Sequence, residues 1–208
     1  MAELLLSTAY LPNIQYIRAI AQNQDATIEL FENFPKQTFR NRCHILTEAG
    51  SSSLSIPVVK GNSKHYMRDT KISYNERWQP QHWHAIVSAY NSSPYFEYFR
   101  DDLEPIIRRQ FTYLIDLNNE INDLIFRILN IKTNIHQTSE YIEPDNTSFT
   151  DLRSAIHPKK SQTVGENYYD ETPYPQVFDS KFGFVPNLSI IDMIFNVGVE
   201  AGELVKQA

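Results

Sequence analysis

The spacing of apolar residues predicts strands in the first part of the chain, with one short helix between them. Residues 3–10 form an apolar run of mixed pattern that is typical of a buried strand, and residues 26–31 alternate like a second strand. Pro12 and Asn13 break the first run, and the apolar residues that follow recur at helical spacing. The chain therefore begins as strand, helix, strand.

Two more strands are predicted on either side of a turn near Gly50, in the segments FRNRCHILTEAG and SSSLSIPVVKG. Alternation along the first of these segments places Arg40, Arg42 and His44 on one face. Two guanidinium groups and an imidazole would then point the same way. Residues 134–142, NIHQTSEYI, are a further strand candidate.

From Pro80 onward the apolar spacing becomes helical. The buried face of the first helix is predicted to consist of Trp83, Ile86, Val87 and Tyr90. A break at residues 91–94 separates it from a second helix, and a longer third helix carries an apolar stripe from Leu114 to Leu129. The last apolar piece predicts a C-terminal helix from about Ser189 to Gly198.

Residues from about 143 to 175 form a long loop rich in Asp, Asn, Ser, Thr and Pro, of a length that usually accompanies function or mobility. The order of the predicted elements indicates an α+β (or α/β) fold. We expect a single layered domain over residues 1–208, with a β-rich N-terminal part, central helices and a C-terminal helix.

Composition is typical of a soluble globular protein and excludes several other classes. The 208 residues are 41% hydrophobic and 21% charged, enough to bury a core of one domain. No apolar run reaches the length of a membrane span, and the N-terminus lacks the basic region of a signal peptide. The single cysteine, Cys43, excludes an internal disulfide and favours a reducing cytoplasm.

Charge is unevenly spread along the chain. Residues 36–77 contain eight basic and three acidic residues, a net charge of +5, whereas the whole chain carries −6. A short basic segment in an acidic protein suggests a local anion site, whereas nucleic-acid binding requires a broader basic face. We therefore expect no nucleic-acid partner. The alternative is that these side chains are solvated and protect strand edges from pairing.

Two histidines, His82 and His84, flank Trp83 in the first central helix. Helix positions two apart differ in direction by about 200°, so these imidazoles cannot bind one metal ion together, and we expect no metal site. His82 lies one turn before Ile86, close to the apolar face. It is either a structural hydrogen-bond donor or a general acid or base in a cleft.

Arg40 and Arg42 are the strongest candidates for ligand binding, because paired guanidinium groups suit phosphate, diphosphate or carboxylate. Adjacent His44 would complete an anion pocket or donate a proton; the alternative is a pair of surface arginines. No P-loop, GxGxxG, GxSxG or CxxC motif is present. Asp192 lies inside an apolar run, so it needs a partner, and we expect it to cap backbone or to pair with an arginine.

Several segments together resemble the WbqC-like protein family over nearly the whole chain. They are YLPNIQY, FRNRCHI, LSIPVVKG, HWHAIVSAYNSSPYFEYF after Trp78, LIDLNNEINDLIFRILNI and NLSIIDMIFNVG. Members of that family are often encoded with bacterial surface-polysaccharide genes, such as those for O-antigen. The resemblance implies a role in making or modifying sugars or glycoconjugates, as a transferase. It supplies no established mechanism and identifies no cofactor.

The resemblance also picks out individual positions. They are Tyr10, Leu11, Pro12, Arg40, Asn41, Arg42, Trp78, His82, Tyr90, Pro94, Tyr95, Phe96 and Asn118. The chain departs from the family pattern at Ser7, Thr8 and Ala9, where many members carry His-Gln-Pro. A catalytic base at that histidine would be missing here.

On this basis the chain is expected to transfer a group to or from a small-molecule or nucleotide-sugar substrate. Arg40 and Arg42 would bind its phosphate, Asn41 would orient the acceptor, and His82 would be the general acid or base. The rings of Tyr10, Trp78 and Tyr95 would line a sugar or base platform. The rival hypothesis is a non-catalytic binding or scaffold protein of a glycan-assembly complex; the sequence leaves a homo-oligomer open.

Overall fold

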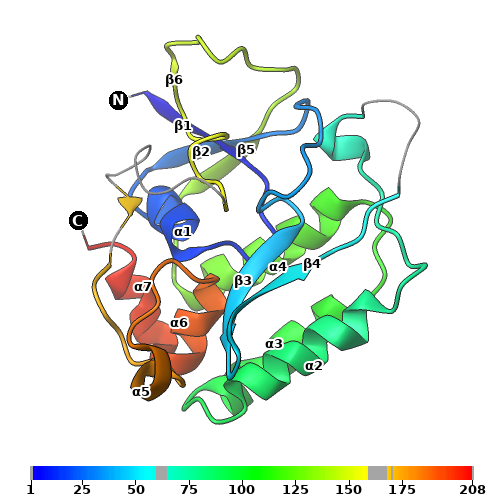
Figure 1. Cartoon of the computed structure of the whole chain (residues 1–208). Helices are drawn as coiled ribbons and strands as arrows, with labels where there is room; N and C mark the ends of the chain where they lie inside the picture. The colour runs from blue at the N-terminus through cyan, green and yellow to red at the C-terminus, as the bar shows by residue number, and fades with distance from the viewer. Residues whose placement is uncertain (1, 60–64, 159–167, 170, 208) are drawn as a thin grey trace.

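The computed structural model describes residues 2–59, 65–158, 168, 169 and 171–207. It is a mixed fold of helices and sheets, with a strand-rich N-terminal part, central helices and a C-terminal helix (Figure 1). The elements are β1 (Glu3–Ser7), α1 (Ile14–Ala21), β2 (Asp25–Glu29), β3 (Arg42–Thr47), β4 (Gly50–Ser55), η1 (Met67–Asp69), α2 (Trp78–Tyr90), α3 (Phe96–Arg108), α4 (Leu114–Ile128), β5 (Asn134–Gln137), β6 (Phe149–Asp151), α5 (Asp179–Phe182), α6 (Ile190–Val197), η3 (Gly198–Glu200) and α7 (Ala201–Leu204).

Four strands form a parallel sheet in the order β5-β2-β1-β6. In the register, Leu5 of β1 lies beside Thr27 of β2 on one side and beside Asp151 of β6 on the other. The chain passes from β1 through α1 to β2, then makes a long excursion to β5, and finally crosses to the opposite edge as β6. The direction of winding therefore reverses between β1 and β6.

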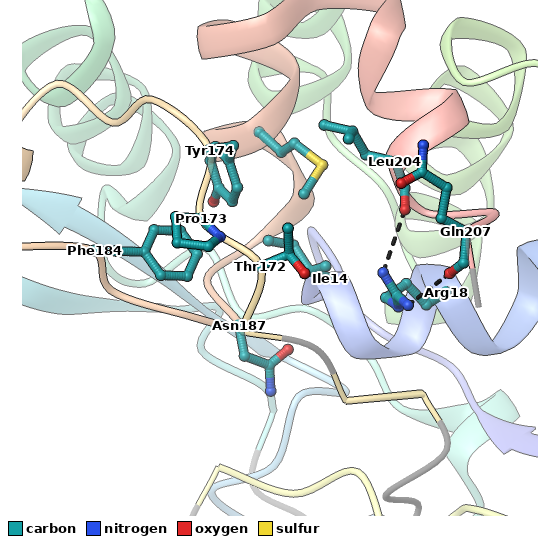
Figure 2. A pocket seen from close by; sticks show the side chains of 10 residues that line it. Ile14, Arg18, Thr172, Pro173, Tyr174, Phe184, Asn187, Leu204 and Gln207 are labelled. Carbon is teal, nitrogen blue, oxygen red and sulfur yellow. Dashed lines mark hydrogen bonds between the residues drawn. The ribbon is translucent and has the colours of Figure 1, made fainter.

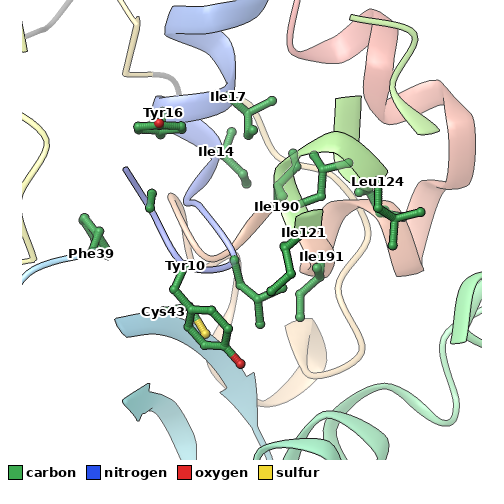
Figure 3. Close-up of a cluster of buried hydrophobic side chains, with 14 of the residues drawn as sticks. Tyr10, Ile14, Tyr16, Ile17, Phe39, Cys43, Ile121, Leu124, Ile190 and Ile191 are labelled. Atoms are coloured by element: carbon green, nitrogen blue, oxygen red, sulfur yellow. The ribbon is translucent and has the colours of Figure 1, made fainter. Parts of the chain in front are cut away.

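The excursion carries the other elements. β3 and β4 form an antiparallel ribbon in which Arg42 lies opposite Ser55, and α2 packs against β3 and α3. One hydrophobic core joins both sheets and the helices. Figure 3 shows part of this core, to which Tyr10, Ile17 of α1, Ile121 of α4 and Ile190 of α6 all contribute. Each of these four side chains is completely buried.

Most of the predicted elements are confirmed. The strands around residues 3–10 and 26–31, the ribbon around Gly50, and the central and C-terminal helices all form where the apolar spacing placed them. α2 begins two residues before Pro80, and α6 ends at Val197 with Gly198 as its C-cap, close to the predicted break. β6 was not predicted, because its three residues lie in the polar loop over residues 143–175. Residues 159–167 and 170 of that loop lie outside the described residues.

Gly202 gives a test of how α7 packs against the end of α4. A Cβ atom at Gly202 would lie 2.4 Å from the carbonyl oxygen of Leu129, too close for any real contact. Replacing glycine by alanine inside a helix usually adds about 1 kcal/mol of stability. Here we expect Gly202→Ala to lower the free energy of unfolding by about 1–3 kcal/mol, measured by urea denaturation. Glu203→Ala, at an exposed neighbour, should change it little; a stabilised Gly202→Ala variant would contradict this packing.

Candidate functional site

A small pocket with both polar and apolar lining lies at the carboxyl ends of β1 and β6, at one edge of the parallel sheet. In open sheets with parallel strands, ligands bind outside the carboxyl ends of the strands at the point where winding reverses. The segments that follow β1 and β6 form much of the wall. The lining residues are Leu6, Ser7, Thr8, Ala9, Tyr16, Phe39, Arg40, Leu152, Arg153 and Ile156.

Arg40 is buried in this pocket and forms a two-pronged ion pair with Glu32, which follows β2. Its Nε donates to Glu32 Oε1 at 2.7 Å, and its Nη2 donates to Glu32 Oε2 at 2.5 Å. Nη2 also donates to the hydroxyl of Ser7 and, at 3.4 Å, to the carbonyl of Arg153. Nη1 has no partner among the described residues. Arg40 therefore joins the ends of β1, β2 and β6 and keeps one nitrogen available.

Arg153 is also buried, and carboxylates surround it. Its Nε and Nη2 donate to Asp151 at 3.0 and 2.6 Å, and its Nη1 donates to Glu29 at 3.1 Å and to the carbonyl of Ile142 at 2.7 Å. Burial lowers the pKa of Arg153, but hydrogen bonds and charge from Asp151, with charge from Tyr141 and Glu29, outweigh burial and raise it. The guanidinium is thus firmly ionised and fully engaged.

Glu29, at the carboxyl end of β2, is completely buried and saturated with donors. It accepts hydrogen bonds from the Phe31 amide at 2.7 Å, Thr138 Oγ1 at 2.8 Å and the Ile142 amide at 2.9 Å, besides that from Arg153. In dinucleotide-binding folds an acidic residue near this place binds a ribose hydroxyl. Here the carboxylate has no capacity left for a ribose.

The N-terminus of α1 is likewise occupied by protein acceptors. The Ile14 amide donates to the Leu188 carbonyl at 3.0 Å, the Gln15 amide to Asn187 Oδ1 at 3.0 Å, and the Tyr16 amide to the Asn13 side chain at 3.3 Å. In nucleotide-binding folds these amides would hold a phosphate. A diphosphate therefore cannot bind at this helix in the usual way.

Asparagines of α4 hold the chain segments that form the pocket. Asn118 Nδ2 donates to Thr8 Oγ1 at 3.1 Å and to the Arg40 carbonyl at 2.9 Å, while Asn122 Nδ2 donates to the Ala9 carbonyl at 3.2 Å. Both asparagines are buried. Asn118, which the family resemblance picked out, thus contacts the segments after β1 and before β3 rather than the pocket itself.

The prediction that Arg40 and Arg42 share one strand face is wrong, because β3 begins only at Arg42 and Arg40 lies in the turn before it. Arg42 and His44 do share a half-buried face of β3. Arg42 Nε donates to Ser55 Oγ on β4 at 2.8 Å. Burial, followed by the charge of Arg42, lowers the pKa of His44, so this imidazole is neutral at pH 7.

The rest of the basic segment is dispersed. Arg68 lies over the ring of Phe31 and Lys71 lies over the ring of Tyr113, whereas Lys60 and Lys64 lie outside the described residues. Asn41 donates from Nδ2 to the carbonyl of Ile56 at 2.8 Å, which fastens the turn before β3 to the end of β4. These groups do not converge on one ligand position.

His82 lies on the other side of the ribbon, in the core between α2 and β4. Its Nδ1 is 2.9 Å from the hydroxyl of Tyr10, its ring centroid is 5.0 Å from that of Trp78, and it bonds the backbone of Ser55. Burial keeps Tyr10 protonated by raising its pKa, so the Tyr10 hydroxyl donates to Nδ1 and Nε2–H donates to the Ser55 carbonyl. His82 contacts neither Arg40 nor Arg42, and its catalytic role stays a prediction.

The three aromatic rings expected to form a platform lie apart or within the core. Tyr10 and Trp78 are 0% and 2% exposed, and both contact His82. Figure 3 shows Tyr10 beside Cys43, among apolar side chains. Tyr95 is 40% exposed, but it lies before α3 against Gly198. Tyr10 and Trp78 therefore meet only around His82 inside the core, and Tyr95 lies elsewhere.

Asp192 was expected to cap backbone or to pair with an arginine, but its partners are a tyrosine and a glutamine. It neither caps backbone with its carboxylate nor pairs with an arginine; it accepts hydrogen bonds from Tyr174 Oη at 2.7 Å and Gln176 Nε2 at 3.0 Å. Burial raises the pKa of Asp192, and hydrogen bonds from Tyr174, Tyr90 and Gln176 oppose that rise. This carboxylate fastens the segment before α5 onto α6.

A second pocket lies between α1, α7 and the segment that carries Tyr174 (Figure 2). Arg18 of α1 donates from Nη1 to the Leu204 carbonyl at 3.3 Å and from Nη2 to the Gln207 carbonyl at 2.7 Å, as the dashed lines show. The guanidinium therefore holds the C-terminal residues against α1. This pocket is a junction between the two ends of the chain.

Two kinds of site are not found in the part of the chain that the structure describes. No group of three or more histidine, cysteine, aspartate or glutamate side chains is arranged to hold a metal ion there. No helix in the same residues has both the length and the apolar character needed to cross a bilayer.

His82 gives a pH test of its environment. Burial lowers the pKa of His82 to about 4, whereas an unfolded histidine titrates near 6.5. Below pH 6.5 the unfolded chain therefore binds a proton that the folded chain rejects. The stabilising contribution of neutral His82 is complete above pH 6.5 and is lost, by about 3 kcal/mol, as the pH falls to about 4.

The comparison is urea denaturation of the wild type and of His82→Gln at several pH values between 4 and 7.5. The glutamine variant should be less stable at pH 7 but should lose stability less steeply below pH 6.5. Equal slopes for the two proteins would show that His82 is not held neutral by burial.

Comparisons with known proteins agree with the resemblance seen in the sequence. The model of the WbqC-like protein family matches residues 8–168 and 159–204. The chain is also similar to the uncharacterized protein Rv1507c of Mycobacterium tuberculosis, with 28% identity over 228 residues, covering 97% of this chain and 96% of that protein. No solved structure matches. Since the family model covers nearly the whole chain, the protein belongs to the WbqC-like family.

Proposed function

We propose that the protein is a transferase of bacterial surface-polysaccharide biosynthesis that holds a phosphorylated or nucleotide-activated sugar at the carboxyl edge of its parallel sheet. The observation that carries this proposal is the arginine-lined pocket at the point where winding reverses between β1 and β6. Such an enzyme would act in the cytoplasm, where sugar donors are made. The substrate and oligomeric state are left open.

The pocket has room for about one water-sized group, so it suits a single sugar hydroxyl better than a phosphate. Arg40 and Arg153 face three carboxylates, those of Glu29, Glu32 and Asp151, so the five groups together carry a formal charge of −1. The free Nη1 of Arg40 and the hydroxyls of Ser7 and Thr8 can bind neutral oxygen atoms. A sugar hydroxyl fits these groups, whereas a diphosphate would meet no excess of positive charge.

A non-catalytic binding protein of a glycan-assembly complex is the second candidate. It is favoured by the lining of the pocket, to which no described carboxylate or imidazole side chain contributes. Burial also raises the pKa of Tyr16, whose hydroxyl donates to the Ser7 carbonyl at 2.9 Å, so this phenol is a poor base. A transferase would therefore take its general base from the rim, where His44 lies near Phe39, or from the substrate itself.

The proposal is tested with a panel of nucleotide sugars. We expect the wild type to bind at least one of them in calorimetry, and Ser7→Ala to bind that ligand about five- to tenfold more weakly, because a hydroxyl in the pocket is lost. Ser92→Ala, at an exposed serine outside the pocket, should bind like the wild type. If the wild type binds none of the nucleotide sugars, the hypothesis that it uses a nucleotide-activated sugar is rejected.

Catalysis is tested with the same nucleotide sugars, by measuring release of the nucleotide in the presence of a glycan acceptor extract. Release that depends on the wild-type protein supports a transferase. Tight binding without any release would favour the binding protein instead.

A further inference from the structure

The arginines near the sheet edge differ in whether their charge is compensated. Arg40 and Arg153 are buried against carboxylates, as described above. Arg42, two residues after Arg40, forms no ion pair with any described residue, and its one side-chain hydrogen bond among them is to the neutral hydroxyl of Ser55. Nη1 and Nη2 of Arg42 remain available. The excess positive charge next to the pocket therefore belongs to Arg42.

Neighbouring groups on the ribbon complete an anion-binding surface around Arg42. His44 lies on the same face of β3, close enough for the charge of Arg42 to affect its titration. In the register of the ribbon, Ser55 lies opposite Arg42 and Ser53 lies opposite His44. Two hydroxyls, an imidazole and a guanidinium fork thus line one half-exposed face, and all of them can donate hydrogen bonds to a phosphate.

Phe39 connects this face with the pocket. Its ring lines the pocket and lies 5.6 Å from the ring of His44, edge to face. The backbone from Phe39 to Arg42 is also fastened at both ends, since the Phe39 carbonyl accepts from the Tyr10 amide at 2.9 Å and the Asn41 carbonyl accepts from the Ile56 amide at 2.8 Å. The pocket and the ribbon face are therefore held next to one another.

We propose that the ribbon face formed by Arg42, His44, Ser53 and Ser55 binds the phosphate or diphosphate of the substrate, while the pocket at Arg40 takes one hydroxyl group of its sugar part. This assignment rests on the proposed function for the identity of the substrate. Arg42 would then bind the anion, and Arg40 would bind a neutral hydroxyl. The anion would lie away from the N-terminus of α1, whose amides are already occupied.

Inorganic pyrophosphate is the probe, because it carries the anion without the sugar. We expect the wild type to bind it in isothermal titration calorimetry at low ionic strength, and Arg42→Gln to bind at least about tenfold more weakly, because charge-assisted hydrogen bonds are lost. The matched control is Arg127→Gln, which removes the same charge from an exposed position on α4 and should bind like the wild type. Thermal unfolding of each variant establishes that it is folded.

Either of two results would overturn the assignment: a wild type that does not bind pyrophosphate, or an Arg42→Gln variant that binds it as tightly as the wild type does. An equal loss in Arg127→Gln would also count against it, because the binding would then follow net charge. Nucleotide-sugar binding without pyrophosphate binding would refute the ribbon site and leave the proposed function standing. Pyrophosphate binding without any nucleotide-sugar binding would refute the proposed function and leave an anion site on the ribbon standing.

Discussion

A buried cluster of two arginines and three carboxylates holds the carboxyl edge of the parallel sheet together. Its members come from the end of β2, the turn before β3 and the segment around β6, so it joins parts of the chain more than a hundred residues apart. Removing one partner from such a cluster leaves a buried charge uncompensated, at a cost of about 3–5 kcal/mol. The cluster therefore fixes the pocket, and it also decides which nearby charges remain free for a ligand.

The helices and most strands were predictable, because the spacing of apolar residues within each segment indicates its secondary structure. Helical spacing over Leu114 to Leu129 reflects one buried face, and the β-branched, alternating residues 26–31 are typical of a strand; both elements form. β6 was not predicted, because three residues in a polar segment are too few to show the alternation of a strand. Arg40 was misplaced for a related reason. The alternation that holds from Arg42 onward extends back to it in sequence, but pairing with Glu32 draws it into a turn.

The site was only partly predictable, because its key contacts are non-local. Helical geometry alone separates His82 from His84, but nothing in the sequence places the hydroxyl of Tyr10 against the imidazole of His82. Glu29 had a usable signal, a carboxylate at the end of a predicted strand, where site residues gather. Arg153 had none, since it follows an unpredicted strand and its partner Glu29 lies 124 residues away.

The C-terminal part of the chain contributes to the first turn of α1. Leu188 and Asn187 supply the oxygen atoms that α1 needs at its start, and Ser189 donates to the carbonyl of Leu11 at 2.8 Å. In nucleotide-binding folds the N-terminus of the first helix is left open for a phosphate. Here the first turn of that helix is incomplete without residues from the far end of the chain. Loss of residues 187–189 would therefore leave the first turn of α1 without these acceptors, although the two segments lie far apart in the sequence.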